Sequence, residues 1–480
     1  MVLSSAFAHA QDSPPQPSGL ALAAAMEQSL QAAIAKAEKS VVAVARVRNN
    51  RDSGPAQAGD LRLAPFGSPP AESDPAHPDF VPSNFGTGVV IDRSGLILTT
   101  CDVLGDLEEH TSSDFYVTAA DRIMREATIE AADPRSNLAV LKVKGGDLTA
   151  INFGDGGKLR KGQIVIALGN PYAIARDGQV SASWGIVSNL QRKAGKSADD
   201  PSPSGKSTLH HLGTLIQTDA KLNFGTSGGA LLNLQGEMVG LTTSMPAAAG
   251  YEQAAGYAIP VDEIFRRILD ELRSGKAVQY GFLGVQPELN AITRQLADPG
   301  VTVRLVVPGG PADLSGIQSG DLITHVNGKP VNDFESLVLH VGSQPAGEQV
   351  QLAVNRGGRE LPIKAILAKS RVIGKPIVTQ PDPAWRGLRV DYWTAIVDLL
   401  VDRDQTHSID EQGCVMVTNV EPESPAAKAG LKPNLAITHV DGARVSSPKE
   451  FMAAAASLSG PVTLRIAAPP LQTATELVVE

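Results

Sequence analysis

A repeated segment constrains the C-terminal half of the chain more than any other feature does. The run Leu322–Gly328 recurs 114 residues later as Ala436–Gly442, and a proline-containing turn precedes both copies. A repeat of roughly 90 residues has the length of one small domain. We therefore predict the same small domain twice, at 278–370 and 384–470, with a linker over 368–383 between them.

Short apolar runs dominate the middle of the chain. From Gly86 to about Pro260, runs of Val, Ile and Leu are separated by Gly, Asp and Asn. Such runs, without helical patterns between them, are typical of short strands in an antiparallel barrel or sandwich. A helix from Val261 to about Ser274 is expected to cap this domain. The predicted fold class is therefore mainly β.

The N-terminal part begins with a predicted helix. Residues 20–39 place Ala, Leu and Ile at helical spacing, and Ser40–Val47 then changes to β character. Residues 49–83 are dense in Pro, Gly, Ser and Asp, which indicates a long loop without a core of its own. We assign 23–275, including this loop, to one domain, and 1–22 to a signal-like remnant and linker.

The first residues resemble the end of a secretory signal peptide. Ala8, His9 and Ala10 form the small-x-small pattern of a cleavage site, although the basic n-region is missing and the apolar stretch is short. We expect export to the periplasm or another extracytoplasmic compartment. An Ala-rich N-terminus without a targeting role is the alternative.

Composition excludes several classes of protein. The 480 residues carry a net charge of -9, which argues against nucleic acid as a partner because phosphates require a basic face. No apolar run reaches the roughly 18 residues that span a bilayer. Cys101 and Cys414 are the two cysteines, and their wide separation predicts neither a disulfide framework nor a CxxC zinc site. We expect no cofactor and no metal.

The segment most informative about function is a glycine-rich run around Ser227. Gly225, Gly228 and Gly229 surround this serine, so its Oγ is expected on a tight turn that also contains Thr226. The backbone N–H groups of Gly225 and Ser227 can converge on one point, which would form an oxyanion hole. The alternative is a glycine-rich turn that carries a serine without chemistry.

The pattern GxSxG also occurs at the nucleophile elbow of α/β-hydrolases. That fold requires a helix directly after the serine. Here Ala230–Gly236 and Met238–Leu241 have the pattern of a hairpin, and the downstream histidines lie within the duplicated domains. We therefore exclude the α/β-hydrolase fold.

The ordered set of motifs resembles the HtrA/Deg family of trypsin-fold serine proteases with C-terminal PDZ domains, from about residue 23 to about 470. The resemblance implies a trypsin-like double β-barrel followed by two PDZ-like α+β domains. It also implies that loop 49–83 extends towards neighbouring protomers. The matching stretches are Gly86–Asp92, Gly95–Thr99, Asp133–Leu141, Ala167–Pro171, Ile216–Asp219, Asn223–Gly229 and Gly256–Pro260.

Two positions depart from the family's catalytic triad. The stretch that carries the catalytic His in this family is Leu98–Leu104 here, and Asp102 takes the place of that His. The catalytic Asp of the family corresponds to Asn137, whereas Ser227 matches the nucleophile. A carboxylate with an ordinary pKa near ~3.9 is a poor base for an alcohol. The Asn137 amide can instead donate a hydrogen bond to Asp102, so we expect a satisfied pair in place of a damaged site.

Other groups are weaker candidates for the missing base or nucleophile. His110 follows the position of Asp102 by eight residues, and His210 and His211 precede a predicted strand. Cys101 lies beside the site, but without a histidine directed at it a small buried residue is the simpler interpretation.

The PDZ-like copies carry the predicted peptide-binding residues. In the first copy, Phe282, Leu283, Gly284 and Val285 resemble the loop whose backbone N–H groups bind a peptide carboxylate. In the second copy we align Gly387–Val390 with this loop, which places Arg389 where a small residue is expected. The bulk of that arginine puts carboxylate binding by the second copy in doubt.

We therefore predict an HtrA-like serine endopeptidase homologue that lacks proteolytic activity. It would bind unfolded or C-terminal peptide segments in protein quality control, as a homo-trimer built through its protease domains. The alternative function is an active serine endopeptidase that uses a surrogate base.

Overall fold

The computed structural model describes most of the two barrels and of both C-terminal domains. The described residues are 19–48, 82, 84–105, 107–146, 148–170, 179–194, 207–223, 225–243, 255–288, 299–397, 410, 412–467 and 475–480. The predicted signal-like remnant and nearly all of loop 49–83 lie outside these residues.

The first barrel is closed by strands in the order β5-β4-β1-β2-β3-β6, with β6 pairing back onto β5. Inward and outward residues alternate along β4, as the pleat of a half-buried strand requires. The strands are β1 (Val41–Arg48), β2 (Asn84–Asp92), β3 (Leu96–Thr100), β4 (Ser113–Thr118), β5 (Met124–Asp133) and β6 (Leu138–Val143).

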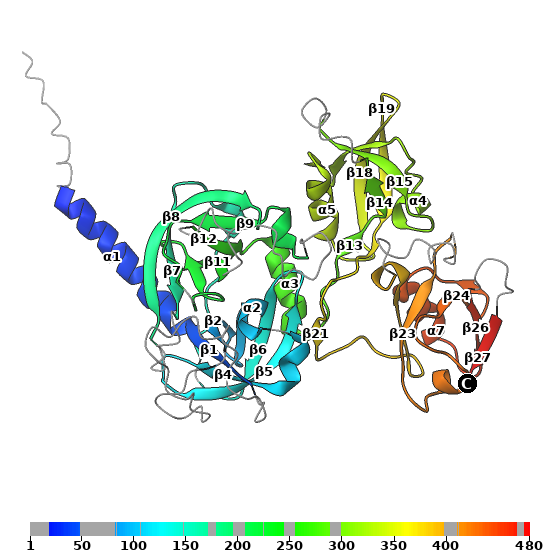
Figure 1. The fold of residues 1–480 in the computed structure, drawn as a ribbon, viewed down its shortest axis with the longest axis horizontal. Helices are drawn as coiled ribbons and strands as arrows, with labels where there is room; N and C mark the ends of the chain where they lie inside the picture. Colours follow the sequence, from blue (N-terminus) through cyan, green and yellow to red (C-terminus); the bar gives the residue numbers. More distant parts are fainter. Residues whose placement is uncertain are drawn as a thin grey trace, which may run out of the picture.

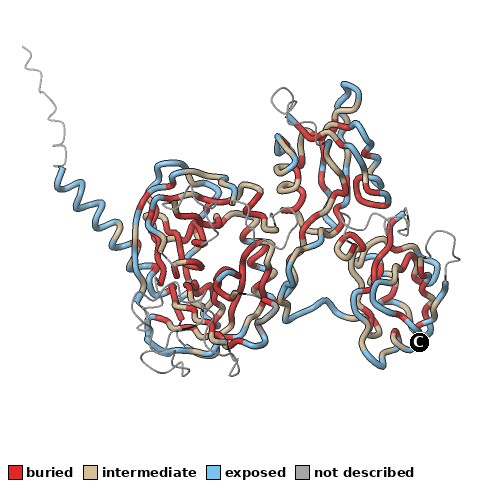
Figure 2. Tube along the Cα trace, viewed as in Figure 1, coloured by how far each residue is buried: buried red, intermediate tan, exposed pale blue. Residues whose placement is uncertain are grey.

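The second barrel is closed in the order β10-β11-β12-β9-β8-β7. It lies beside the first barrel, and buried residues fill both interiors (Figure 1, Figure 2). Its strands are β7 (Ile164–Gly169), β8 (Ser181–Arg192), β9 (Leu215–Thr218), β10 (Ala230–Leu232), β11 (Met238–Thr243) and β12 (Gly256–Pro260). This arrangement confirms the predicted mainly β double barrel.

Within the described residues, the α-helices that accompany the barrels are α1 (Gly19–Ala37), α2 (Cys101–Leu104) and α3 (Glu263–Arg273). The side chain of Asp262 caps α3 by accepting the Phe265 N–H, and Phe265, Ile268, Leu269 and Leu272 form its buried face. By contrast, the N-terminal part of α1 projects away from the barrels and is exposed (Figure 2). Within the described residues, the structure holds no helix with the length and apolarity needed to cross a membrane.

The first C-terminal domain is a small sheet, in the order β14-β15-β16-β18-β19, that packs against a helix. Strand β17 pairs with β16, and β13 pairs with β20, which brings the two ends of the domain together. Its elements are β13 (Gly281–Phe282), β14 (Val285–Pro287), β15 (Val301–Val306), α4 (Pro311–Leu314), β16 (Leu322–Val326), β17 (Lys329–Pro330), α5 (Phe334–Gly342), β18 (Gln349–Arg356), β19 (Arg359–Ile366) and β20 (Ala368–Lys369).

The second C-terminal domain repeats this design, with the order β22-β23-β24-β26-β27 and β25 on β24. Its elements are β22 (Leu388–Tyr392), β23 (Val415–Val420), α6 (Pro425–Lys428), β24 (Ala436–Val440), β25 (Ala443–Arg444), α7 (Pro448–Ala456), β26 (Val462–Ile466) and β27 (Thr475–Val479). Between the two domains, β21 (Ile377–Val378) pairs with β5 of the first barrel.

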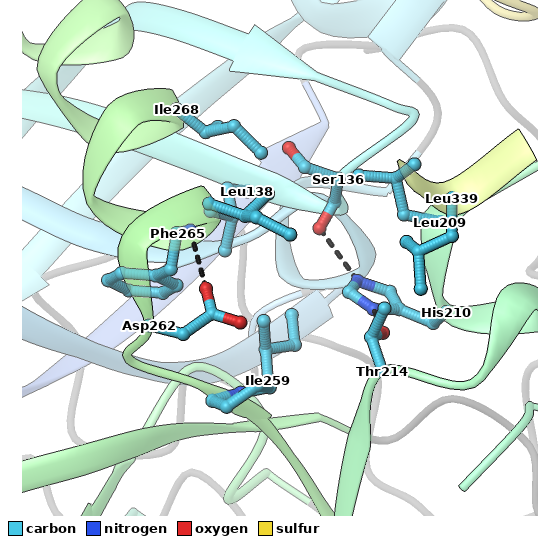
Figure 3. Close-up of a pocket in the computed structure, with 12 residues that line it drawn as sticks. Ser136, Leu138, Leu209, His210, Thr214, Ile259, Asp262, Phe265, Ile268 and Leu339 are labelled. Atoms are coloured by element: carbon cyan, nitrogen blue, oxygen red, sulfur yellow. Dashed lines mark hydrogen bonds between the residues drawn. The ribbon is translucent and has the colours of Figure 1, made fainter. Parts of the chain in front are cut away.

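A pocket lies where α3, the 136–138 segment and residues 209–214 meet α5 of the first C-terminal domain (Figure 3). His210 lines it and is buried, with Nε2 2.8 Å from the Ser136 carbonyl oxygen and Nδ1 2.8 Å from Thr214 Oγ1. Burial lowers the pKa of His210 to about 4. The imidazole is therefore neutral, with Nε2–H donating to the carbonyl.

This depressed pKa predicts acid instability. The unfolded chain takes up a proton near the ordinary histidine pKa of 6.5, while the folded chain resists protonation until about pH 4. Stability should therefore fall by up to about 3 kcal/mol as pH decreases across this window. Urea denaturation between pH 7 and pH 4 would measure the loss, which should be smaller in His210→Gln. Equal slopes in the two proteins would contradict the assignment.

Candidate functional site

The structure brings Asp102 and Asn137 into direct contact. Asp102 lies in the first turn of α2, directly after β3, and Asn137 lies in the turn between β5 and β6. Asn137 Nδ2 donates to Asp102 Oδ2 at 2.9 Å, and the Asp102 N–H donates to Asn137 Oδ1 at 3.3 Å. Two hydrogen bonds in opposite directions thus join the residues that the sequence resemblance aligns with the family's His and Asp.

The backbone holds Asn137 in a conformation that few side chains adopt. Its φ is 56°, in the left-handed region where asparagine is enriched. Its carbonyl oxygen accepts the Cys101 N–H at 3.2 Å, which ties the turn to the start of α2. Asn137 is buried, so its amide group needs the partners that it has.

Asp102 is exposed as a residue, but protein atoms surround its carboxyl group closely enough to raise the pKa above 3.8 by desolvation. Hydrogen bonds from Asn137 at 2.9 Å and from Thr243 Oγ1 at 3.4 Å oppose this rise. Because solvent reaches the residue, the carboxyl is a carboxylate at neutral pH. Its hydrogen bonds suit that charged form.

Ser227 lies just before β10 and is 6% exposed. Its Oγ is 3.1 Å from Thr100 Oγ1, so the two hydroxyls are within hydrogen-bond distance. The Ser227 carbonyl oxygen accepts the Thr87 N–H at 2.8 Å, which fixes the turn against β2 of the other barrel. The nucleophile position therefore lies at the seam between the barrels.

The turn around Ser227 requires its glycines. Gly228 has φ of 81°, and a Cβ there would lie 2.1 Å from the Thr87 carbonyl oxygen. Gly225 also has a positive φ of 92°, and its carbonyl oxygen accepts the Thr87 hydroxyl at 2.8 Å. The Thr226 N–H donates within the turn to the Asn223 carbonyl at 3.1 Å. Thr226 therefore shapes the predicted oxyanion turn, leaving the amides of Gly225 and Ser227 as the candidate donors.

Three threonines at this site were not predicted from the sequence. Thr87 braces the serine turn, Thr100 contacts the serine hydroxyl, and Thr243 approaches both Asp102 and Asn137. The sequence offered a signal only for the first two, because Thr87 lies within Gly86–Asp92 and Thr100 within Leu98–Leu104.

The other histidines considered as bases are engaged elsewhere. His210 is buried, with one ring nitrogen at Ser136 and the other at Thr214. His211 is also buried, and its Nδ1 lies 3.0 Å from Thr208 Oγ1. The side chain of His110 lies outside the described part of the structure. These contacts argue against His210 and His211 as bases for Ser227.

Cys101 is also a poor nucleophile. Its Sγ donates weakly to the Leu138 and Asp133 carbonyl oxygens at 3.4 and 3.5 Å. Desolvation, together with the nearby charges of Asp133 and Asp102, raises its thiol pKa well above 9. Among the described residues, no group of three or more His, Cys, Asp or Glu side chains could hold a metal ion.

The predicted peptide-binding loop of the first C-terminal domain lies between β13 and β14. Gly284 has φ of 85°, and its carbonyl oxygen accepts the Val307 N–H at 2.9 Å. The Leu283 carbonyl oxygen accepts the Ala312 N–H at 2.8 Å. Strand β14 is the outer strand of its sheet, and Leu283 and Val285 pack in the same apolar cluster as residues of α5. Phe282, by contrast, packs towards the second C-terminal domain.

The alignment of the second copy with this loop was wrong by two residues. Leu388 pairs with Val420 as Val285 pairs with Val306, and the Gly387 carbonyl oxygen accepts the Glu421 N–H as Gly284 accepts that of Val307. The equivalent loop is therefore Trp385–Leu388. Gly387 has a positive φ, as Gly284 has, and this shared conformation marks the register.

Arg389 consequently lies on β22, outside this loop. Its guanidinium pairs with Glu421 at 3.1 Å and donates to the Asp382 carbonyl oxygen at 3.0 Å. Within the loop, the Leu388 N–H donates to the Trp385 carbonyl oxygen at 2.8 Å, and the Trp385 indole N–H donates to the Ala455 carbonyl oxygen at 3.1 Å. The loop is thus closed on itself by contacts that do not involve Arg389.

Family models match both parts of the chain. A trypsin-like peptidase domain matches residues 86–241, and a PDZ domain matches 281–367 and again 398–466. Solved structures of the HtrA-type protease AlgW, with a decapeptide and with a tripeptide, are 24% and 22% identical to the chain. Each covers 71% of the chain, over 98% and 96% of its own length, with a TM-score of 0.50. At this identity they support the fold alone.

Curated relatives extend over most of the chain. A probable periplasmic serine endoprotease DegP-like of Ectopseudomonas mendocina is 31% identical over 382 residues, which are 78% of this chain and 75% of the relative. The periplasmic pH-dependent serine endoprotease DegQ of Escherichia coli is 30% identical over 438 residues, 89% of this chain and 87% of the relative. Their periplasmic names confirm the expected export. The chain belongs to the HtrA/Deg family of trypsin-fold serine endoproteases with C-terminal PDZ domains.

Proposed function

We propose that this HtrA-family protein binds unfolded or C-terminal peptide segments without cleaving them, as part of protein quality control. The observation that carries the proposal is the Asn137–Asp102 hydrogen bond at 2.9 Å, which stands where the family has its acid and base. The Ser227 hydroxyl meets Thr100 at 3.1 Å, and Thr100 cannot act as a base at neutral pH.

The missing base affects both halves of a serine-protease cycle. The base must take the Ser227 proton as the hydroxyl attacks, and it must then give a proton to the leaving amine. A carboxylate at position 102 removes a proton from an alcohol poorly and is rarely protonated near neutral pH. Asn137 cannot make up for the missing base. Its neutral amide would not stabilise the positive charge that a base carries after it takes the Ser227 proton.

The remaining parts of the site suit the binding of a polypeptide without its cleavage. Removing a triad member leaves roughly 10³–10⁴-fold acceleration over water from the oxyanion hole and binding, too little for useful proteolysis. The turn from Gly225 to Gly228 keeps the hydrogen bonds that shape it. A polypeptide can therefore lie in the cleft and leave again uncut.

The first PDZ domain supplies the main peptide-binding site in this proposal. The N–H groups of the Phe282–Val285 loop would hold a C-terminal carboxylate, and the peptide would add a strand beside β14. The apolar cluster of Leu283, Leu337 and Val341 favours an apolar last side chain. In the second domain, the Leu388 N–H is already engaged by Trp385, which favours a role as scaffold.

Assembly would strengthen weak peptide binding. We propose a homo-trimer, in which three tethered PDZ domains raise the effective concentration to about millimolar. The exposed apolar residues of α1, Leu20 at 81% and Leu22 at 59%, favour burial against another copy.

The proposed lack of proteolytic activity predicts that Ser227 does not affect the rate at which a substrate is cleaved. Wild-type protein and Ser227→Ala should degrade unfolded casein at the same background rate, because no base activates the hydroxyl. A fluorophosphonate probe should label the wild type weakly or not at all. Cleavage clearly above that of Ser227→Ala, or rapid stoichiometric labelling, would instead establish the alternative of a surrogate base.

Replacing the two substituted residues with the His and Asp of the family should restore peptide cleavage. Asp102→His together with Asn137→Asp should give measurable Ser227-dependent cleavage, because their side chains already lie in contact. Asp102→His alone should be weaker by up to roughly 10⁴-fold, the effect of an Asn in place of the triad Asp. The control is the same double variant with Ser227→Ala. A folded double variant without activity would show that the cleft has diverged further, for example at Thr100.

Peptide binding should depend on the first PDZ domain. In Gly284→Trp the new Cβ would lie 3.2 Å from the Phe282 ring, and the strained backbone and large ring should abolish binding of a fluorescent decapeptide with a free C-terminal leucine. The amidated decapeptide should bind poorly to the wild type. Arg389→Ala, on β22 of the second domain, is the control and should bind normally. If Gly284→Trp is folded and still binds, the barrel cleft is the binding surface.

The proposed assembly is tested by light scattering of the full chain at micromolar concentration. The expected mass is that of a trimer or a larger multiple of three, and Leu20→Glu with Leu22→Glu should shift it towards the monomer. A wild-type mass equal to one chain would show that the proposed trimer is wrong.

A further inference from the structure

The segment that leaves the first PDZ domain lies along the first barrel, although the sequence predicts it as a linker. Strand β21 pairs antiparallel with β5, with Ile377 opposite Ala132 and Val378 opposite Ala131. Figure 1 shows β21 beside the barrel, at the start of the connection to the second PDZ domain. The first barrel thus gains a short strand from more than 200 residues later in the chain.

Side chains reinforce this pairing on both sides. Ile377 packs against the apolar core of the first barrel, and Val372 packs against the core cluster that extends into the second barrel. Thr379 Oγ1 donates to the Glu130 carbonyl oxygen at 2.9 Å. The N–H groups of Thr379 and Gln380 both donate to the Gly275 carbonyl oxygen, at 3.0 and 2.8 Å. Residues 370–380 are therefore held along their length, and we call them the strap.

The strap also contacts the turn that leads to Asn137. Arg135 Nη1 donates to Ser370 Oγ at 3.1 Å and to the Arg371 carbonyl oxygen at 3.3 Å. Gly374 lies close to Pro134, and a Cβ at this glycine would lie 3.2 Å from the proline ring. The contacts of the strap thus reach from Glu130, on β5, to Arg135, two residues before Asn137.

The entrance to the first PDZ domain is bonded to the same turn. The Tyr280 hydroxyl donates to the Asp133 carboxylate, and both side chains are buried. Ser136 donates its N–H to Asp133 Oδ2 at 2.8 Å. The Ser370 N–H donates to the Tyr280 carbonyl oxygen at 2.7 Å, so the chain entering the domain and the chain leaving it are joined at this point.

We propose that Ile377 and Tyr280 are positioning residues, which act through residues 130–136 to hold Asn137 against Asp102. The strap would keep the first PDZ domain at a fixed place on the barrel, and loosening it would loosen the Asn137–Asp102 pair. This role concerns the placement of the pair and does not depend on whether the protein cleaves peptides.

Limited trypsin digestion tests the strap itself. Arg371 is exposed within it and is followed by Val372, so the rate of cleavage after Arg371 reports how firmly the strap is held. In the full-length protein, Ile377→Ser should speed this cleavage at least tenfold, whereas Ile377→Val should cleave at the wild-type rate. The control is Ile366→Ser, at an isoleucine that is 65% exposed on β19, and it should have no effect. Unchanged cleavage in Ile377→Ser would overturn the strap.

Hydrogen exchange tests the positioning role. The Asp102 amide donates to Asn137 Oδ1 at 3.3 Å, so its exchange rate reports the position of the Asn137 side chain. Exchange of Asp102 and of residues 131–137 should become at least tenfold faster in Ile377→Ser and in Tyr280→Phe. Ile377→Val and Ile366→Ser should match the wild type. Wild-type exchange of Asp102 in folded Ile377→Ser and Tyr280→Phe would overturn the positioning role, even if trypsin cleaves the strap faster.

Discussion

The buried carboxylate of Asp133 is the group on which the arrangement of domains and site depends. It is 2% exposed, and burial raises its pKa while the hydrogen bonds from Ser136 and Tyr280 oppose the rise. An unpaired carboxylate in such a place would cost several kcal/mol, so its donors must be held in position. Those donors come from the turn that carries Asn137 and from the chain that enters the first PDZ domain. The need to pair the Asp133 carboxylate thus fixes both the turn that carries Asn137 and the start of the first PDZ domain.

The substituted site is internally consistent. The carboxylate of Asp102 places a negative charge beside a buried turn. Asn137 accommodates it, because its side chain donates one hydrogen bond to Asp102 and accepts another from it. An aspartate at position 137 would instead place two like charges within hydrogen-bond distance, which disfavours the ionised pair. The bond from the Asn137 amide to the Asp102 carboxylate involves a charged group, and such bonds contribute about 1.5–3 kcal/mol, so the two residues stabilise each other.

The sequence was sufficient to predict the double barrel and the duplicated domain, which depend on motifs whose order along the chain is fixed by strand pairing. It also predicted the contact between Asn137 and Asp102, which the structure shows as a hydrogen bond. Thr243 was missed because it reaches the site from β11, through a contact that no local pattern records. The PDZ register predicted for the second copy was wrong because its loop, Trp385–Leu388, carries Arg386 where the first copy has Leu283. Strand β21 is two residues long, too short for any periodicity to reveal it.

The two PDZ domains also pack against each other, so the strap, which holds the first domain, bears on the second as well. Phe282 and Val307 of the first domain pack with Trp393 and Met416 of the second, and Lys369 pairs with Asp391 beside this apolar contact. The Thr394 hydroxyl donates to the Lys369 carbonyl oxygen at 2.6 Å. Because Phe282 begins the proposed carboxylate-binding loop, a peptide bound there meets a loop that is braced from outside by the second domain. The second domain can thereby shape peptide binding by the first without binding a peptide itself.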